Sequence, residues 1–181
     1  MSRPSGHATD TEPLELWEYT LIMAKLPKHW QVFYELMWQT GTRVGEVLRL
    51  SKRDVENGGV WITSEKRSDK LREYVPLTPD FSRTLKDLAE KRSEVHLFPY
   101  TPQAAWLALR KAAKDAGVRA DSIHPHLFRH AMGHRAYKQT HDIVLVSRML
   151  RHKDLSSTQR YVKPTIAEVR DAFRNVNKSD Q

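Results

Sequence analysis

Four short patterns hold most of the side chains in this 181-residue chain that could do chemistry. They are Thr40-Gly-Thr-Arg-Val-Gly-Glu46, the pair Glu65-Lys66, the segment His124-Pro-His-Leu-Phe-Arg-His130, and Leu150-Arg-His152 followed nine residues later by Tyr161. Arginine binds anionic oxygens, histidine and lysine transfer protons, and tyrosine can act as a nucleophile. These side chains are therefore the first candidates for a functional site.

Each pattern taken singly also has a plainer interpretation. Arg43 begins an amphipathic stretch, where a charged side chain is commonly just solvated. Lys66 lies in a polar stretch between two β-prone segments, and a lysine at a hairpin tip is normally only exposed. Tyr161, in Arg-Tyr-Val, is compatible with a tyrosine of the core or its rim. The combination therefore matters more than any single member.

Three histidines, His126, His130 and His134, recur at intervals of four residues and would share one face of a helix. Pairs of histidines at this spacing can bind zinc. Leu127 stands where the glutamate of a His-Glu-x-x-His site would be, and Arg129 would repel a dication. We therefore expect no metal here, with a metal-dependent nuclease as the alternative.

Charge and composition favour an anionic partner. Lysine and arginine number 30 against 22 acidic residues, which gives a net charge of +8, and nucleic acid is the commonest partner of such a chain. Cysteine is absent, so disulfides, thiolate zinc sites and a cysteine nucleophile are excluded. No apolar run approaches the roughly 18 residues of a membrane span. Residues 1–6 contain no signal-like apolar stretch. We expect a cytoplasmic, nucleoid-associated protein.

Periodicity and capping residues predict a mainly α-helical fold with one small antiparallel β-sheet. Helices are expected after Thr11, through Val32–Trp38 up to Gly41, over 80–91, over 102–116 up to Gly117, and over 143–150 after Asp142. Thr78-Pro79 and Thr101-Pro102 each resemble an N-cap followed by proline. Capping boxes are expected at 156–159 and 165–168. Val60–Thr63 and Glu73–Leu77 predict a hairpin with a basic tip of Lys66, Arg67, Lys70 and Arg72.

The order and spacing of the four patterns resemble the tyrosine recombinase family, which includes phage integrases, chromosome-dimer resolvases and fimbrial invertases. That family's pattern is Thr-Gly-x-Arg-x-x-Glu, a hairpin lysine, His-x-x-Arg-His, then Leu-x-His and a tyrosine nine residues on. Every element is present in order, and the likeness runs from about residue 12 to about 175. The stretch from His124 to Gly133 looks especially like the short fimbrial invertases.

The resemblance implies a role for each site residue. Tyr161 would attack a DNA phosphodiester, Arg43 and Arg129 would stabilise the transition state, and His126 would accept the proton. Lys66 would protonate the leaving oxygen and His152 would bind the phosphate. Glu46 would orient Arg43, and His130 would support Arg129. The reaction needs no cofactor.

Three positions depart from the family pattern. Lys66 lies ten residues before Pro76 and Lys70 six, whereas about eight is usual, so either lysine could be the general acid. Phe128 replaces the common leucine. Arg151 replaces the usual glycine before His152.

The resemblance further implies a catalytic domain over residues 11–176, with a disordered tail at 1–10 and a short tail at 177–181. We expect a site-specific recombinase that works on double-stranded DNA as a homo-tetramer through a Holliday junction. The segment after Thr165 would dock on a neighbouring protomer. A type IB topoisomerase and a non-catalytic DNA-binding remnant remain the alternatives. The target site and the direction of exchange are not encoded in these patterns.

Overall fold

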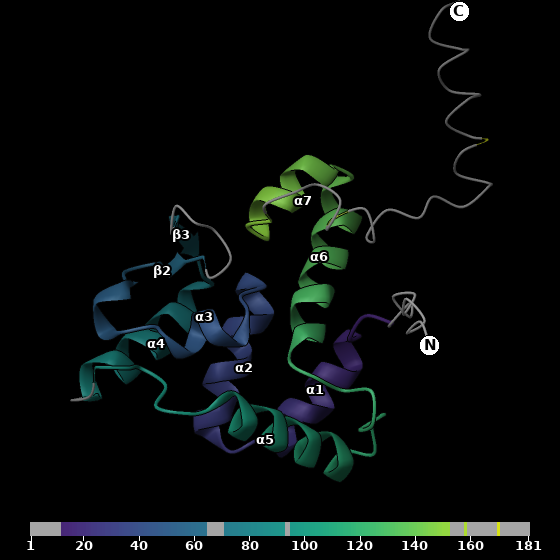
Figure 1. Cartoon of the computed structure of the whole chain (residues 1–181), viewed down its shortest axis with the longest axis horizontal. Helices are drawn as coiled ribbons and strands as arrows, with labels where there is room; N and C mark the ends of the chain where they lie inside the picture. Colours follow the sequence, from purple (N-terminus) through teal and green to yellow (C-terminus); the bar gives the residue numbers. More distant parts are fainter. Residues whose placement is uncertain (1–11, 65–70, 93–94, 153–157, 159–169, 171–181) are drawn as a thin grey trace, which may run out of the picture.

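The computed structural model of the protein describes residues 12–64, 71–92, 95–152, 158 and 170. These residues form a mainly helical fold with one small antiparallel sheet, which confirms the predicted fold class (Figure 1). In chain order the elements are α1 (Leu16–Lys25), α2 (Lys28–Thr40), α3 (Val44–Leu48), the 3-10 turn η1 (Lys52–Asp54), β1 (Val55–Glu56), β2 (Gly59–Thr63), β3 (Arg72–Pro76), α4 (Pro79–Lys91), α5 (Pro102–Asp115), α6 (His126–Thr140) and α7 (Ile143–Met149).

Most helix ends follow from the capping residues that the sequence supplies. The Thr101 hydroxyl accepts a hydrogen bond from the Ala104 amide at 3.1 Å and caps α5. The Asp142 carboxylate accepts from the amides of Val144 and Leu145 and caps α7. Thr78 is the N-cap residue of α4 and Pro79 begins the helix, as predicted, but the Thr78 hydroxyl accepts a hydrogen bond from the Gln39 side chain and caps no amide of the helix.

The predicted hairpin is present, and it is joined by a strand that the sequence did not indicate. Strands β2 and β3 pair antiparallel with Val60 opposite Val75, and the two-residue β1 adds to the other edge of β2. Arg72 begins β3 rather than lying at a loop tip, and its guanidinium stacks over Trp61 at 5.0 Å.

The helix cap predicted at Thr11 is wrong, because the first helix begins only at Leu16 and its N-cap residue is Glu15. Other predictions fall outside the described residues. They concern the lysines and arginine at the hairpin tip, the capping boxes at 156–159 and 165–168, and both tails. The domain bounds 11–176 therefore stay a prediction. Within the described ranges, no helix combines the length and apolar character that a membrane crossing requires.

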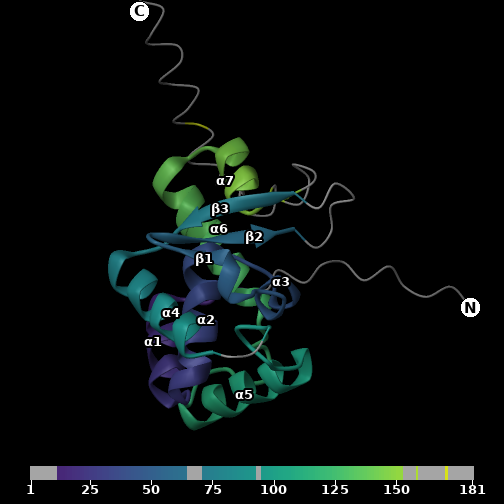
Figure 2. The same cartoon turned by 90° about the vertical axis from the view of Figure 1, so that its left-hand side faces the viewer.

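A continuous apolar core holds the helices together, and α2 runs through its centre. Phe33 and Tyr34 are completely buried, and the Phe33 ring meets the Phe98 ring edge-on at 5.4 Å. Helix α6 packs along α2, while a smaller apolar cluster of Ala136, Val146 and Leu150 joins α6 to α7. Helix α6 thus packs on α2 and carries α7 near its C-terminal end (Figure 1), and α7 lies beside β3 (Figure 2).

Candidate active site

The turn between α2 and α3 forms the floor of the candidate site. Gly41 ends α2 with a left-handed φ of 62°. A β-carbon at this glycine would lie 2.6 Å from the Leu150 side chain, closer than any real contact. Any larger residue here would force the Leu150 side chain to shift, so glycine suits both the left-handed turn and its close approach to the end of α7.

Arg43 and Glu46 meet at the start of α3. One Glu46 carboxylate oxygen accepts from the Arg43 Nη1 atom and the other from the Arg43 amide, both at 2.9 Å. The Glu46 side chain has no exposed surface, whereas the Arg43 side chain keeps 17% of its own. The buried carboxylate therefore holds one end of the guanidinium and fixes the orientation of the Arg43 side chain.

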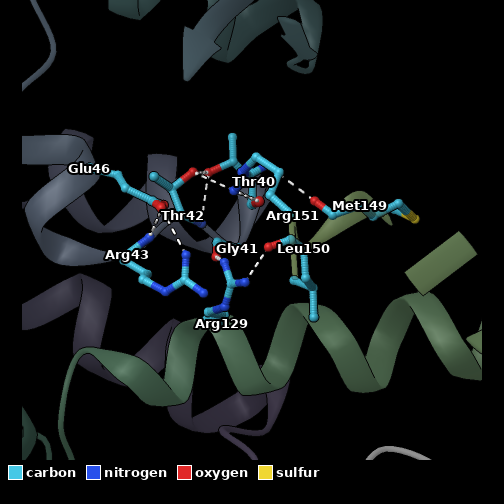
Figure 3. A network of polar contacts seen from close by, with 9 residues as sticks. All are labelled: Thr40, Gly41, Thr42, Arg43, Glu46, Arg129, Met149, Leu150 and Arg151. Carbon is cyan, nitrogen blue, oxygen red and sulfur yellow. Dashed lines mark hydrogen bonds and ion pairs between the residues drawn. The ribbon is translucent and has the colours of Figure 1, made fainter. Parts of the chain in front are cut away.

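Arg129 lies at the centre of the site although it is 99% buried, with only 1% of its surface exposed. It stands on the first turn of α6 and crosses to two other segments. Its Nη1 atom donates to the Gly41 carbonyl at 2.7 Å, and its Nη2 atom donates to the Leu150 carbonyl (Figure 3). Arg129 therefore joins the turn after α2 to the end of α7, two residues before His152.

His126 and His130 lie one turn apart on α6, with ring centroids 5.0 Å apart. Burial, together with the positive charges of Arg129 and Arg43 and the neighbouring histidines, lowers the pKa of His126 to about 4. The imidazole is therefore neutral near physiological pH, and a neutral imidazole can accept a proton. Both arginines thus help to lower the pKa of His126, the residue predicted to accept the proton.

His152 follows α7 directly. Its amide donates to the Ser147 carbonyl at 3.0 Å, and its Nδ1 atom lies 2.7 Å from the hydroxyl of the buried Thr158. These bonds fix both the backbone and the ring of His152. The structure thus brings Arg43, Glu46, Arg129 and the α6 histidines to one site and ties the segment that carries His152 to it. Lys66 and Tyr161 lie outside the described residues.

One member of the site was not predicted from the sequence. In the family pattern, Arg151 is only the residue that replaces a glycine. In the structure its side chain is buried and reaches back to the turn after α2. Its backbone φ of 55° is the left-handed conformation that glycine favours. A sequence pattern containing arginine here gives no indication that the side chain turns inward.

Comparison with known proteins places the chain in a family. The profile of the phage integrase family matches residues 9–168, so the chain belongs to that family. Its curated relatives include the tyrosine recombinase XerD of Rhizobium meliloti, 29% identical over 166 residues, and XerA of Thermococcus onnurineus, 26% identical over 174 residues. The matches cover 85% and 86% of this chain but only 52% and 59% of those proteins. The chain thus spans little more than half the length of these relatives.

Solved structures share the fold. XerA recombinase superposes with a TM-score of 0.73 at 19% identity, covering 95% of this chain and 66% of that one. The catalytic domain of bacteriophage HP1 integrase gives a TM-score of 0.68 at 17% identity, covering 89% and 92%. The Tn1549 transposon integrase in complex with transposon right end DNA gives 0.78 at 12% identity, covering 98% and 69%. The fold is therefore that of integrase and recombinase catalytic domains. The particular likeness to fimbrial invertases stays a prediction.

Proposed function

We propose that this chain is the catalytic domain of a site-specific DNA recombinase that cuts and rejoins DNA through a covalent tyrosine intermediate. The observation that carries the proposal is the convergence of Arg43, Arg129 and a neutral His126 at one site. Family membership, the relatives' names and the net charge of +8 support the same conclusion.

In the proposed reaction, the Tyr161 oxygen attacks the scissile phosphorus while the bond to the 5′-oxygen breaks. The products are a 3′-phosphotyrosyl ester and a free 5′-hydroxyl, so one ester replaces another and no cofactor is consumed. A tyrosine hydroxyl has a pKa of about 10, so it needs a base. His126, which is neutral in this structure, takes that proton, and Lys66 gives one to the leaving oxygen.

The two arginines serve the transition state, in which negative charge gathers on the non-bridging phosphate oxygens. A guanidinium stays charged at working pH and presents a planar fork of donors, which suits this charge better than a lysine does. Glu46 orients Arg43, and the two carbonyl contacts of Arg129 fix its plane. His130 lies one turn from His126 and supports this arrangement, while His152 hydrogen-bonds the phosphate.

The proposed substrate is double-stranded DNA that carries specific recombination sites, and the proposed working unit is a homo-tetramer. Exchanging both strands of two duplexes requires four cleavages, each with its own nucleophile, and a Holliday junction lies between the two pairs of cuts. An open cavity of about 610 Å³ lies between β3, α6 and α7, and Met132, Leu145 and Met149 contribute apolar surface to it. Such a cavity is suited to receive an apolar segment of a neighbouring protomer, such as the one that follows Thr165.

The decisive experiment is covalent trapping on a nicked suicide substrate that carries the cognate site. We expect a denaturant-resistant adduct on the 3′ side of the nick. Tyr161→Phe removes only a hydroxyl, so the adduct should disappear while DNA affinity persists. Tyr137→Phe is the matched control and should still form it. An adduct that survives in Tyr161→Phe, or that maps by mass spectrometry to another residue, contradicts the proposal. Supercoil relaxation without joint products would favour the topoisomerase alternative.

The general acid is tested separately. Lys66→Ala should slow cleavage of ordinary DNA but regain much of its rate on a 5′-bridging phosphorothiolate, because sulfur leaves without being protonated. Lys70→Ala is the paired variant. Rescue of Lys70→Ala but not of Lys66→Ala would transfer the role to Lys70.

A further inference from the structure

Arg151 occupies an unfavourable position for an arginine. It is one of two non-glycine residues in the described part of the chain with a positive φ, the other being His141. Its surface is only 3% exposed, and none of the carboxylates in the described ranges forms an ion pair with it. Backbone strain and a buried charge both cost stability, so other contacts must hold the side chain in place.

Those contacts connect two separate segments. Arg151 donates from Nη1 to the Met149 carbonyl at 3.1 Å, and from Nη2 to the Thr40 carbonyl and the Thr42 hydroxyl, both at 3.2 Å (Figure 3). Its Nε atom is buried without a hydrogen-bond partner. The guanidinium therefore spans from the end of α7 to the turn after α2, and it does so without satisfying all of its own donors.

Arg129, which stands on α6, bridges the same two segments. Its acceptors are the carbonyls of Gly41 and Leu150, and those of Arg151 are on the neighbouring residues Thr40, Thr42 and Met149. The two guanidinium groups thus bind neighbouring acceptors on both segments (Figure 3). We call the place where the Thr40–Thr42 turn meets the end of α7 the junction. Arg43 comes one residue after the acceptor Thr42, and His152 comes two residues after the acceptor Leu150.

We propose that Arg151 is a positioning residue that clamps the Thr40–Thr42 turn to the end of α7 and so fixes Arg43 and His152 on the same phosphate. The inference rests on the proposed recombinase function. Arg151 acts through its neighbours: its hydrogen bonds tie the Thr40–Thr42 turn to the end of α7, and its remaining nitrogen, Nε, is enclosed by protein. A glycine at this position would remove the strain and also remove the clamp.

The test compares Arg151→Gly with wild type in single-turnover cleavage. Glycine accepts the left-handed φ, so the variant should fold and bind DNA within about threefold of wild type, while the maximal cleavage rate falls at least about thirtyfold. Arg151→Lys keeps the charge without the fork and should also be slow. Added ethylguanidinium should restore part of the rate in Arg151→Gly and none in Arg151→Lys. Arg83→Ala, which removes an exposed arginine of α4, is the control variant and should cleave normally.

A second measurement is independent of cleavage. In protein labelled with ¹⁵N-histidine and free of DNA, the His152 ring signals should shift in Arg151→Gly, because the contact between Nδ1 and Thr158 loosens. They should stay unchanged in Arg83→Ala. If wild type forms no adduct, the proposed function fails, and this spectrum still decides whether Arg151 positions His152. A wild-type cleavage rate or an unchanged His152 spectrum in Arg151→Gly overturns the clamp.

Discussion

The aromatic core around α2 and the junction beneath the candidate site are both buried, but they are built on different physics. In the core, Phe33 and Phe98 meet through ring contacts with little directional demand. In the junction, Arg129 and Arg151 donate hydrogen bonds to backbone oxygens of two segments. Apolar burial tolerates substitutions of similar volume, whereas a charged fork on fixed acceptors requires one geometry. Conservative substitutions in the core should therefore cost only stability, whereas loss of a guanidinium fork in the junction should mainly slow cleavage.

The largest expected effect is on the cleavage rate, which a substitution in the junction should lower and a substitution in the core should not. Arg129→Lys keeps the charge but loses the fork, and the loss of one transition-state donor typically lowers the rate about 100- to 1,000-fold. Single-turnover cleavage on pre-bound substrate measures this, with DNA affinity followed alongside. Phe33→Leu is the counterpart in the core. It should cost about 1 kcal/mol of unfolding free energy and leave cleavage by the folded protein unchanged. Near-normal cleavage by Arg129→Lys would remove that residue from the site.

A second comparison uses two glycines with the same backbone conformation. Gly41 has φ 62° and Gly117 has φ 69°, so alanine at either position is strained. Only at Gly41 does a β-carbon meet Leu150, whereas at Gly117 nothing lies within 4 Å. Gly117→Ala should cost about 1 kcal/mol from strain, and Gly41→Ala about 3 kcal/mol because overpacking adds to it. Chemical denaturation measures both. Equal losses would show that the turn does not press against α7.

The third expected effect is on the pH dependence of stability. The pKa of His126 is lowered from 6.5 to about 4 in the folded protein. Between these two pH values, His126 is therefore protonated in the unfolded chain but not in the folded protein. The unfolding free energy should therefore fall as the pH drops from about 6.5 to about 4. Denaturation midpoints across this range measure the slope. His126→Asn should flatten it, whereas the exposed His96→Asn should not. A wild-type slope in His126→Asn would contradict the burial of this imidazole.

Local sequence signals predicted the secondary structure where the physics is local. Thr101 and Asp142 cap their helices because their oxygens reach amides within the same turn. Thr78 is also an N-cap residue, but its hydroxyl makes no capping hydrogen bond. Gln39, which lies 39 positions earlier, donates to that hydroxyl instead. Strand β1 was not predicted because two residues carry too little alternation to be recognised, and its pairing with β2 defines it.

The sequence by itself determined the family, the order of the reactive residues and the mainly helical fold, because each depends on residue types and spacings along the chain. Only the tertiary structure decided which charges are buried and what holds them. Nothing in the run Leu150-Arg-His152 indicates that the arginine between them turns inward. Its acceptors, Thr40 and Thr42, lie more than a hundred residues away in the chain, and only the packing of α6 on α2 and α7 brings them within hydrogen-bond distance.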